Sequence, residues 1–252
     1  MTVGFDRKIR AGWLDVTARL AAAGLSPSTI RDELDEVLDG EVSGEGPHSA
    51  RGKTKTVLLH VWVTVPQGVV PLRDEALGVV GSGGGAPDLR PLHWGMCLTT
   101  YPFFRDVAAI TGRLLSLQGS VTLAMVSRRI AERCGARSTV LRASQRVVRS
   151  MVEWGALSET GQRGVFRSGP PIGVLDAVPG DGWLAGWLLE AALFASGRQS
   201  MRVESLARHP MLFPFQTGAT ARDATARTRL DLFREGAGED VVAWKDFPAA
   251  HG

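Results

Sequence analysis

The sequence is poor in the residues that build disulfide frameworks and metal sites. Its 252 residues include two cysteines, Cys97 and Cys134, and five histidines that are scattered along the chain. No pair of these side chains has the spacing of a zinc site and no CxxC motif is present, so we expect no metal and no other cofactor. Two cysteines in a chain of this length do not form a disulfide framework, which favours a reducing compartment.

Long apolar runs are also missing. The most apolar stretch, residues 182–196, is interrupted by Glu190 and is shorter than the roughly 20 apolar residues that span a bilayer. The first residues of the chain become charged at once and lack the apolar core of a signal peptide. We therefore expect a cytoplasmic protein that makes no membrane contact.

Hydrophobic periodicity predicts that most of the chain is helical. Near the start, Ile9 to Leu20 carries apolar residues at helical spacing, and Ser26-Pro27-Ser28 opens a second helix. Residues 54–65 are apolar and β-branched, so a helix and a strand are both open, and we favour a helix. A short helix follows from Pro71 to Val80. The glycine-rich segment 81–87 is the clearest linker in the chain.

Beyond that linker, the pattern alternates between helices and short strands. The expected helices cover 92–117, with a bend near Pro102, and then 120–134, 138–154, 183–194 and 202–208. The expected strands form one hairpin at 157–167 and another at 227–234 and 240–244. The predicted fold class is therefore mainly α, with a helical N-terminal region (1–86), a central region (87–169) and an α+β C-terminal region with a short hairpin (170–252).

The net charge of +3 conceals an uneven distribution of charged residues. Residues 101–170 contain eleven arginines and four acidic residues, a net charge of +7, so the remainder of the chain carries −4. A basic block within a nearly neutral protein indicates an anionic partner.

Within the basic block, two helices joined by a tight turn are followed by a hairpin. Thr122 is placed to cap the first helix, and Gly135 lies in the turn, where a left-handed backbone suits glycine. Ser138 or Thr139 is expected to cap the second helix. One face of that helix is apolar and carries Val140, Val147, Met151 and Trp154. The opposite face is polar and mainly basic, and it carries Arg142, Arg146, Arg149 and Glu153, with Gln145 at its flank.

This order of elements resembles the winged helix-turn-helix family of DNA-binding domains, over about Tyr101 to Arg167. The resemblance implies that the helix from Ser138 to Trp154 enters the major groove, where arginine and glutamine pair with base edges. It also implies phosphate contacts from the preceding helix, from the N-terminus of the second helix and from the hairpin. The expected DNA-binding residues are Arg128, Arg129, Ser138, Thr139, Arg142, Gln145, Arg146, Arg149, Arg163 and Arg167, with Arg133 as a further phosphate contact.

We therefore expect a protein that binds double-stranded DNA without catalysis. A transcription regulator is the simplest role. A DNA-binding accessory subunit of a larger bacterial assembly, such as an antiviral phage-defence system, is compatible, although no motif specifies it. The large flanking regions favour a protein partner or self-association. The alternative is a scaffold whose winged helix packs on a partner protein, because winged helices also serve as protein-binding modules.

Three further segments have simpler explanations than catalysis or ligand binding. Arg51-Gly52-Lys53-Thr54 resembles the end of a phosphate-binding loop, but an acidic segment with Pro47 precedes it instead of a buried strand, so exposed charges or an accessory phosphate contact are favoured. His93 and Cys97 lack a third catalytic partner, which favours a packed helix start. For the apolar residues 211–215 we favour core packing over a partner-docking surface. No catalytic set converges in the sequence, so we do not expect an enzyme.

Overall fold

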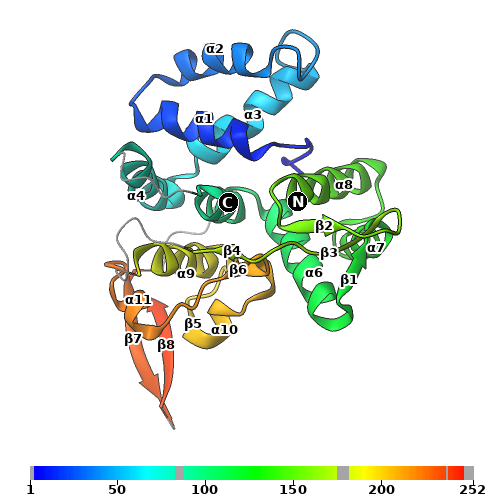
Figure 1. Cartoon of the computed structure of the whole chain (residues 1–252). Helices are drawn as coiled ribbons and strands as arrows, with labels where there is room; N and C mark the ends of the chain where they lie inside the picture. The colour runs from blue at the N-terminus through cyan, green and yellow to red at the C-terminus, as the bar shows by residue number, and fades with distance from the viewer. Residues whose placement is uncertain (1–2, 83–87, 175–181, 237, 247–252) are drawn as a thin grey trace.

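The computed structural model describes residues 3–82, 88–174, 182–236 and 238–246 (Figure 1). Helices account for most of these residues, and the short strands form three small sheets. The fold class is mainly α with an α+β C-terminal part, as the periodicity predicts. The expected linker at 81–87 falls largely outside the described residues.

Four helices form the N-terminal layer, at the top of the molecule in Figure 1. They are α1 (Ala11–Ala22), α2 (Pro27–Leu38), α3 (Ala50–Trp62) and α4 (Val70–Gly81), the last preceded by a 3₁₀ turn at Gln67–Val69. The start of α2 follows the predicted pattern, since the Ser26 hydroxyl accepts a hydrogen bond from the Thr29 amide (3.2 Å) and Pro27 is the first helical residue. The predicted helix at 54–65 is confirmed as α3, which is buried on most sides and therefore shows no simple periodicity.

The apolar stretch 92–117 forms two helices and not the single bent helix that we expected. The first, α5 (Arg90–Thr100), ends before Tyr101, whose backbone is extended at φ −125° and ψ 92°. Pro102 then begins α6 (Pro102–Gln118). Proline has no amide hydrogen, so it interrupts the hydrogen-bond ladder here but suits the first position of a new helix. Every residue of α5 after Arg90 is buried, and α5 lies at the centre of the molecule (Figure 1).

A compact unit of two helices and a small antiparallel sheet follows α6. Its elements are β1 (Ser120–Thr122), α7 (Leu123–Cys134), α8 (Ser138–Glu153), β2 (Leu157–Glu159) and β3 (Val165–Ser168), and the strand order is β1-β3-β2. The helix expected from residue 120 starts later, because 120–122 pair with β3, with Val121 opposite Phe166 and both buried. The expected cap is confirmed, since the Thr122 hydroxyl accepts a hydrogen bond from the Met125 amide (3.2 Å).

The C-terminal part combines helices with two small sheets. Its elements are β4 (Ile172–Gly173), α9 (Trp183–Ser196), β5 (Ser200–Arg202), α10 (Val203–Ala207), a 3₁₀ turn at Pro210–Leu212, β6 (Phe215–Gln216), α11 (Ala221–Thr225), β7 (Leu230–Glu235) and β8 (Glu239–Trp244). β4 and β6 pair in parallel, and β5, β8 and β7 form an antiparallel sheet in that order. The predicted hairpin is confirmed as β7–β8. None of the described helices is long and apolar enough to cross a membrane.

One hydrophobic core runs through these parts, with Trp94 of α5 near its middle. The Trp94 ring makes edge-on contacts with Phe104, Trp154, Phe213 and Phe215 at centroid separations of 5.2, 6.0, 5.5 and 5.6 Å. Its indole N–H donates a hydrogen bond to the backbone carbonyl of Met211 (2.8 Å). The apolar residues 211–215 therefore pack in the core, as we favoured.

A buried ionic cluster joins the N-terminal layer to the C-terminal part. Arg227 and Arg229, which precede β7, each form ion pairs with both Glu75 of α4 and Glu190 of α9. The Glu190 side chain is fully buried and that of Arg227 is 5% exposed. Burial alone would raise the pKa of Glu75, but the hydrogen bonds from Arg229 and Arg227 hold it below its usual value. Each charge is thus compensated by two opposite charges, which makes its burial tolerable.

Removal of one acid from this cluster should destabilise the fold strongly. We expect Glu190→Ala to lower the free energy of unfolding by about 3–5 kcal/mol, because it leaves the buried Arg227 without its buried partner. Urea denaturation followed by circular dichroism measures this change. The control is Glu204→Ala, which removes the exposed partner of Arg208 and should change the free energy by less than about 0.5 kcal/mol. Equal stability of the two variants would contradict the expectation.

Two glycines provide a test of how tightly α6 packs. A Cβ atom at Gly112 of α6 would lie 2.0 Å from the Pro210 carbonyl oxygen, whereas a Cβ atom at Gly78 of α4 meets nothing within 4 Å. Gly112→Ala should therefore cost about 1–3 kcal/mol of stability through overpacking. Gly78→Ala should add roughly 0.5–1 kcal/mol, because alanine is the better helix former. Thermal melts of both variants measure the signs, and a stabilising Gly112→Ala would show that the packing is looser than described.

Candidate nucleic-acid interface

The helix α8 separates its side chains into a buried face and a basic face. Val140, Val147, Met151 and the following Trp154 are buried, as predicted. The exposed residues Arg142, Gln145, Arg146 and Arg149 follow one another at steps of three, one and three, so they share the opposite side of the helix. We call these four residues the α8 face.

The arginines of the α8 face are free to bind an external anion. Within the described part of the chain, none of the three forms an ion pair with an acidic side chain. Two other predicted contacts are already engaged: Arg129 of α7 pairs with Glu132 (3.0 Å), and Arg133 pairs with Asp106 (3.1 Å). The pair at Arg129 is half exposed on both sides and can be exchanged for another anion at little cost.

The N-terminus of α8 differs from the expectation that Ser138 or Thr139 would cap it. Arg137 is the N-cap residue, with an extended backbone and no side-chain hydrogen bond to the helix. Ser138 and Thr139 are instead the first two helical residues, and both are exposed. The first amide groups of a helix have no acceptor within it, so this uncapped end presents backbone donors and two hydroxyls to the solvent.

The hairpin β2–β3 adds two further arginines. Its turn contains Gly164 at φ +75°, a left-handed conformation that favours glycine, and places the exposed Arg163 at the tip. Arg167 lies on the middle strand, opposite Ser120 on one side and Ser158 on the other. Since Phe166 points into the core, Arg167 points to the outer face of the sheet, where it is exposed.

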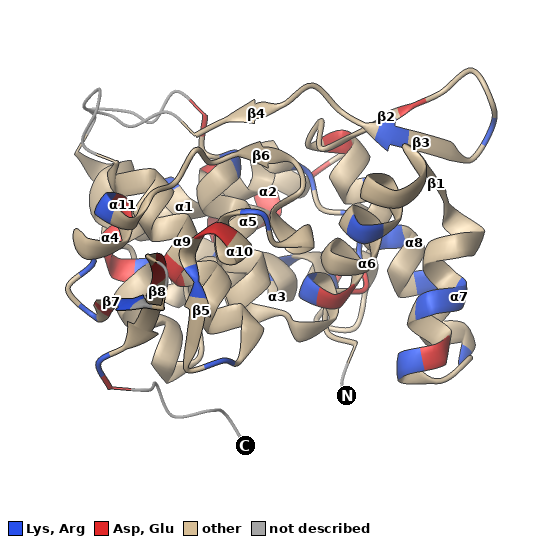
Figure 2. Ribbon diagram, turned by 90° about the horizontal axis from the view of Figure 1, so that it is seen from below, with Lys and Arg blue, Asp and Glu red and all other residues tan. Residues whose placement is uncertain are grey.

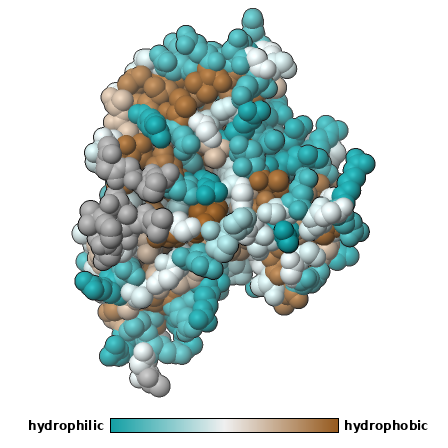
Figure 3. All heavy atoms as spheres, viewed as in Figure 1, coloured by the Kyte–Doolittle hydropathy of each residue, from teal (hydrophilic) through white to brown (hydrophobic). Residues whose placement is uncertain are grey.

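These elements lie together at one end of the molecule. α7, α8 and the sheet β1-β3-β2 form the right-hand end in Figure 1, and the view from below shows basic residues on α7, α8 and β3 (Figure 2). Apolar residues reach the surface between α1 and α2, whereas the right-hand end is mostly hydrophilic (Figure 3). All the predicted DNA-binding residues are exposed, including Arg128 of α7.

The far end of α8 is fixed by contacts that no sequence pattern indicates. The Ser150 hydroxyl accepts a hydrogen bond from the Ile9 amide (2.9 Å), and the Glu153 carboxylate accepts one from the Ala11 amide (2.8 Å). The Trp154 indole donates to the Ile9 carbonyl (2.9 Å), and Arg90 donates to the Trp154 carbonyl (2.9 Å). The partners are far apart in sequence, so only the fold reveals them. They hold α8 against the N-terminal layer and leave the α8 face uncovered.

The segment that resembles a phosphate loop has a packing role. Gly52 lies in the first turn of α3, where a Cβ atom would come within 2.2 Å of the Gly46 carbonyl oxygen. The backbone carbonyl oxygens of Gly46 and Pro47 therefore lie beside the first turn of α3, where they would repel a phosphate. Arg51 pairs with Asp39 (2.8 Å) and Lys55 pairs with Asp35 (2.5 Å). Lys53 alone of the basic residues in this segment is exposed.

His93 and Cys97 belong to the buried helix α5 and do not line a cleft. The Trp62 indole donates to Nδ1 of His93 (3.2 Å), so the proton is assigned to Nε2, which lies 2.8 Å from the Asp15 carboxylate. Burial lowers the pKa of His93 and raises the pKa of the Cys97 thiol. A buried, protonated thiol is a poor nucleophile. In the described residues, no group of three or more His, Cys, Asp or Glu side chains is arranged to hold a metal ion.

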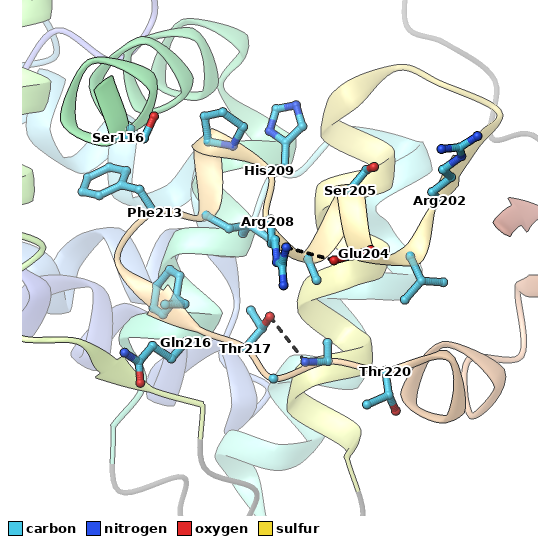
Figure 4. A pocket seen from close by; sticks show the side chains of 18 of the residues that line it. Ser116, Arg202, Glu204, Ser205, Arg208, His209, Phe213, Gln216, Thr217 and Thr220 are labelled. Carbon is cyan, nitrogen blue, oxygen red and sulfur yellow. Dashed lines mark hydrogen bonds and ion pairs between the residues drawn. The ribbon is translucent and has the colours of Figure 1, made fainter. Parts of the chain in front are cut away.

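A cleft of about 910 Å³ lies between α6, α10 and the loop that follows β6 (Figure 4). Four of its charged residues pair with one another, Arg208 with Glu204 (2.9 Å) and Arg202 with Glu239 (2.7 Å), while Asp240 lies 3.5 Å from Arg234 of β7. His209 also lines the cleft, and its pKa is lowered by burial and by the nearby Arg198 and Arg113. The residues come from separate segments of the chain, so sequence patterns do not indicate this cleft.

The buried His93 should make stability depend on pH. Because its pKa is lowered in the folded state, the unfolded chain takes up the proton first as the pH falls below about 6.5. Stability should therefore be constant above that pH and fall below it, by at most about 1.4 kcal/mol per pH unit for this group. Urea denaturation at pH 7.5 and 5.5 measures the loss. His93→Gln should be less stable than the unmodified protein at pH 7.5 and should lose less stability between pH 7.5 and 5.5. His209→Gln measures separately the contribution of the second histidine whose pKa is lowered. An unchanged pH dependence in His93→Gln would contradict the assignment.

The candidate interface is thus defined by exposed arginines on a helix and a hairpin at one end of the molecule, none of which forms an ion pair within the described residues. Sequence patterns indicated the α8 face and the hairpin but not the contacts that hold them in place. No family model matches the chain, and no curated protein and no solved structure match it.

Proposed function

We propose that this protein binds double-stranded DNA without catalysis, with the α8 face in the major groove. The observation that carries the proposal is the α8 face itself: three exposed arginines without acidic partners in the described residues, and a glutamine beside them, on one side of a helix. An α-helix fits the width of the major groove, and these side chains can form paired hydrogen bonds with guanine and adenine.

The elements around the α8 face favour a DNA duplex over a small anion as the ligand. Three helices followed by a hairpin, here α6, α7, α8 and β2–β3, are the order that the resemblance to winged helix-turn-helix domains implies, with β2–β3 as the wing. Arg128 on α7, the uncapped start of α8, and Arg163 and Arg167 on the hairpin surround the α8 face with donors for backbone phosphates. Most of the affinity would come from these phosphate contacts, and base readout from the α8 face.

The role that fits this binding is that of a transcription regulator or of a DNA-binding accessory subunit in a larger bacterial assembly, such as one that acts in phage defence. The apolar surface between α1 and α2 is compatible with a protein partner (Figure 3). The competing function is a scaffold in which the α8 face packs on a protein, and the DNA-binding experiment below separates the two.

Removal of two arginines from the α8 face should weaken DNA binding. We expect Arg142→Ala combined with Arg146→Ala to lower the affinity for a mixed-sequence duplex by at least about tenfold at low salt, and the affinity of the unmodified protein to fall steeply as salt is added. Fluorescence anisotropy with a labelled duplex over a salt series measures both quantities.

The matched control is Arg31→Ala combined with Arg222→Ala. These arginines are also exposed but lie on α2 and α11, so the variant loses the same charge from other parts of the surface. It should bind almost as tightly as the unmodified protein. Absence of duplex binding by the unmodified protein at low salt would overturn the proposal and favour the scaffold.

A further inference from the structure

The first described residues form a strap that lies against α8. We define the strap as residues 3–10. Phe5 and Ile9 of the strap are fully buried, and Phe5 packs edge-on against Tyr101 at a centroid separation of 5.3 Å. The backbone of Ile9 bonds to α8 in both directions, donating to Ser150 and accepting from Trp154. The strap is therefore a fixed part of the fold.

The place where the strap is attached borders the α8 face. Ser150 is four residues after Arg146 and directly follows Arg149, so it lies on the side of α8 next to the basic face. Arg146 is also linked to this point through its backbone, since its carbonyl accepts a hydrogen bond from the Ser150 hydroxyl (3.1 Å). The residue directly before Ile9 in the strap therefore lies next to the point where the strap is bonded to Ser150.

Lys8 is that residue. It precedes Ile9, whose side chain faces the core, and Lys8 is exposed. Within the described residues, Lys8 forms no ion pair. Its basic neighbours are engaged: Arg10 pairs with Glu41 (2.8 Å) and lies over the Trp13 ring (5.2 Å), while Arg7 lies 3.8 Å from Asp6. Lys8 is therefore the strap cation that is available to another anion.

We propose that the strap is an accessory part of the DNA-binding surface, in which Lys8 contacts a backbone phosphate beside the C-terminal half of α8. This inference rests on the proposed function. The groove that receives a helix is bordered by phosphates on both sides, and the hairpin arginines and α7 supply contacts from other elements of the interface. Lys8 adds a cation from a segment whose overall charge is negative, since residues 1–50 carry five basic and nine acidic residues.

Single-lysine variants of the full chain test this assignment. Lys8→Ala should weaken binding to the labelled duplex by roughly two- to tenfold at low salt and make the salt dependence shallower by about one, and Lys8→Arg should restore both. The matched control is Lys245→Ala, because Lys245 is also exposed but follows β8, at the end of the molecule away from α8 (Figure 1). It should bind as the unmodified protein does.

A proximity measurement keeps the test independent of stability. A photo-crosslinking residue placed at position 8 should form a covalent adduct with the duplex, and the same residue at position 245 should not. Equal weakening by Lys8→Ala and Lys245→Ala, or no adduct from position 8, would overturn the inference. If the Arg142 and Arg146 variant is impaired while Lys8→Ala binds normally, the strap inference alone fails. If neither variant is impaired, the proposed function fails with it.

Discussion

The cluster of Glu75, Glu190, Arg227 and Arg229 is the constraint on which the arrangement of the two flanking parts depends. Each carboxylate pairs with both arginines, and Glu190 is enclosed within a very apolar helix. Such an array is stable only if all four members are in position, because any one of them alone would be an uncompensated charge. α4, α9 and the segment before β7 must therefore come together as a set, even though they are far apart in the chain.

α5 extends that constraint to the basic end of the molecule. Trp94 packs against aromatic rings from α6, the end of α8 and β6, and Arg90 at the start of the same helix donates a hydrogen bond to the Trp154 carbonyl at the end of α8. The α8 face is thus presented by a helix whose far end is bonded to α5 and to the strap. Its arginines are held on a rigid element, which reduces the conformational entropy that binding would remove.

Local patterns predicted the helices and hairpins well and the contacts between them poorly. Thr122 was identified as a cap because the hydroxyl and the amide that it binds are three residues apart. The capping of α8 was predicted wrongly because three successive residues, Arg137 to Thr139, can each start a helix, and the extended backbone at Arg137 decides between them. β1 was missed because three residues carry too little pattern, and its pairing with β3 exists only in the fold. The partners of Glu190 and of Ser150 lie far away in sequence and leave no local sign.

The close approach of α6 to the turn at Pro210 affects how the basic unit is held in the molecule. At Gly112 the helix comes so close to the Pro210 carbonyl group and the Phe213 side chain that a Cβ atom would not fit. At the opposite side, the strap and Glu153 bond α8 to the start of α1. In the described residues, the basic unit is therefore anchored on two sides, by close packing at Gly112 and by hydrogen bonds to the strap and to α1, and these contacts set the orientation of the α8 face relative to the N-terminal layer.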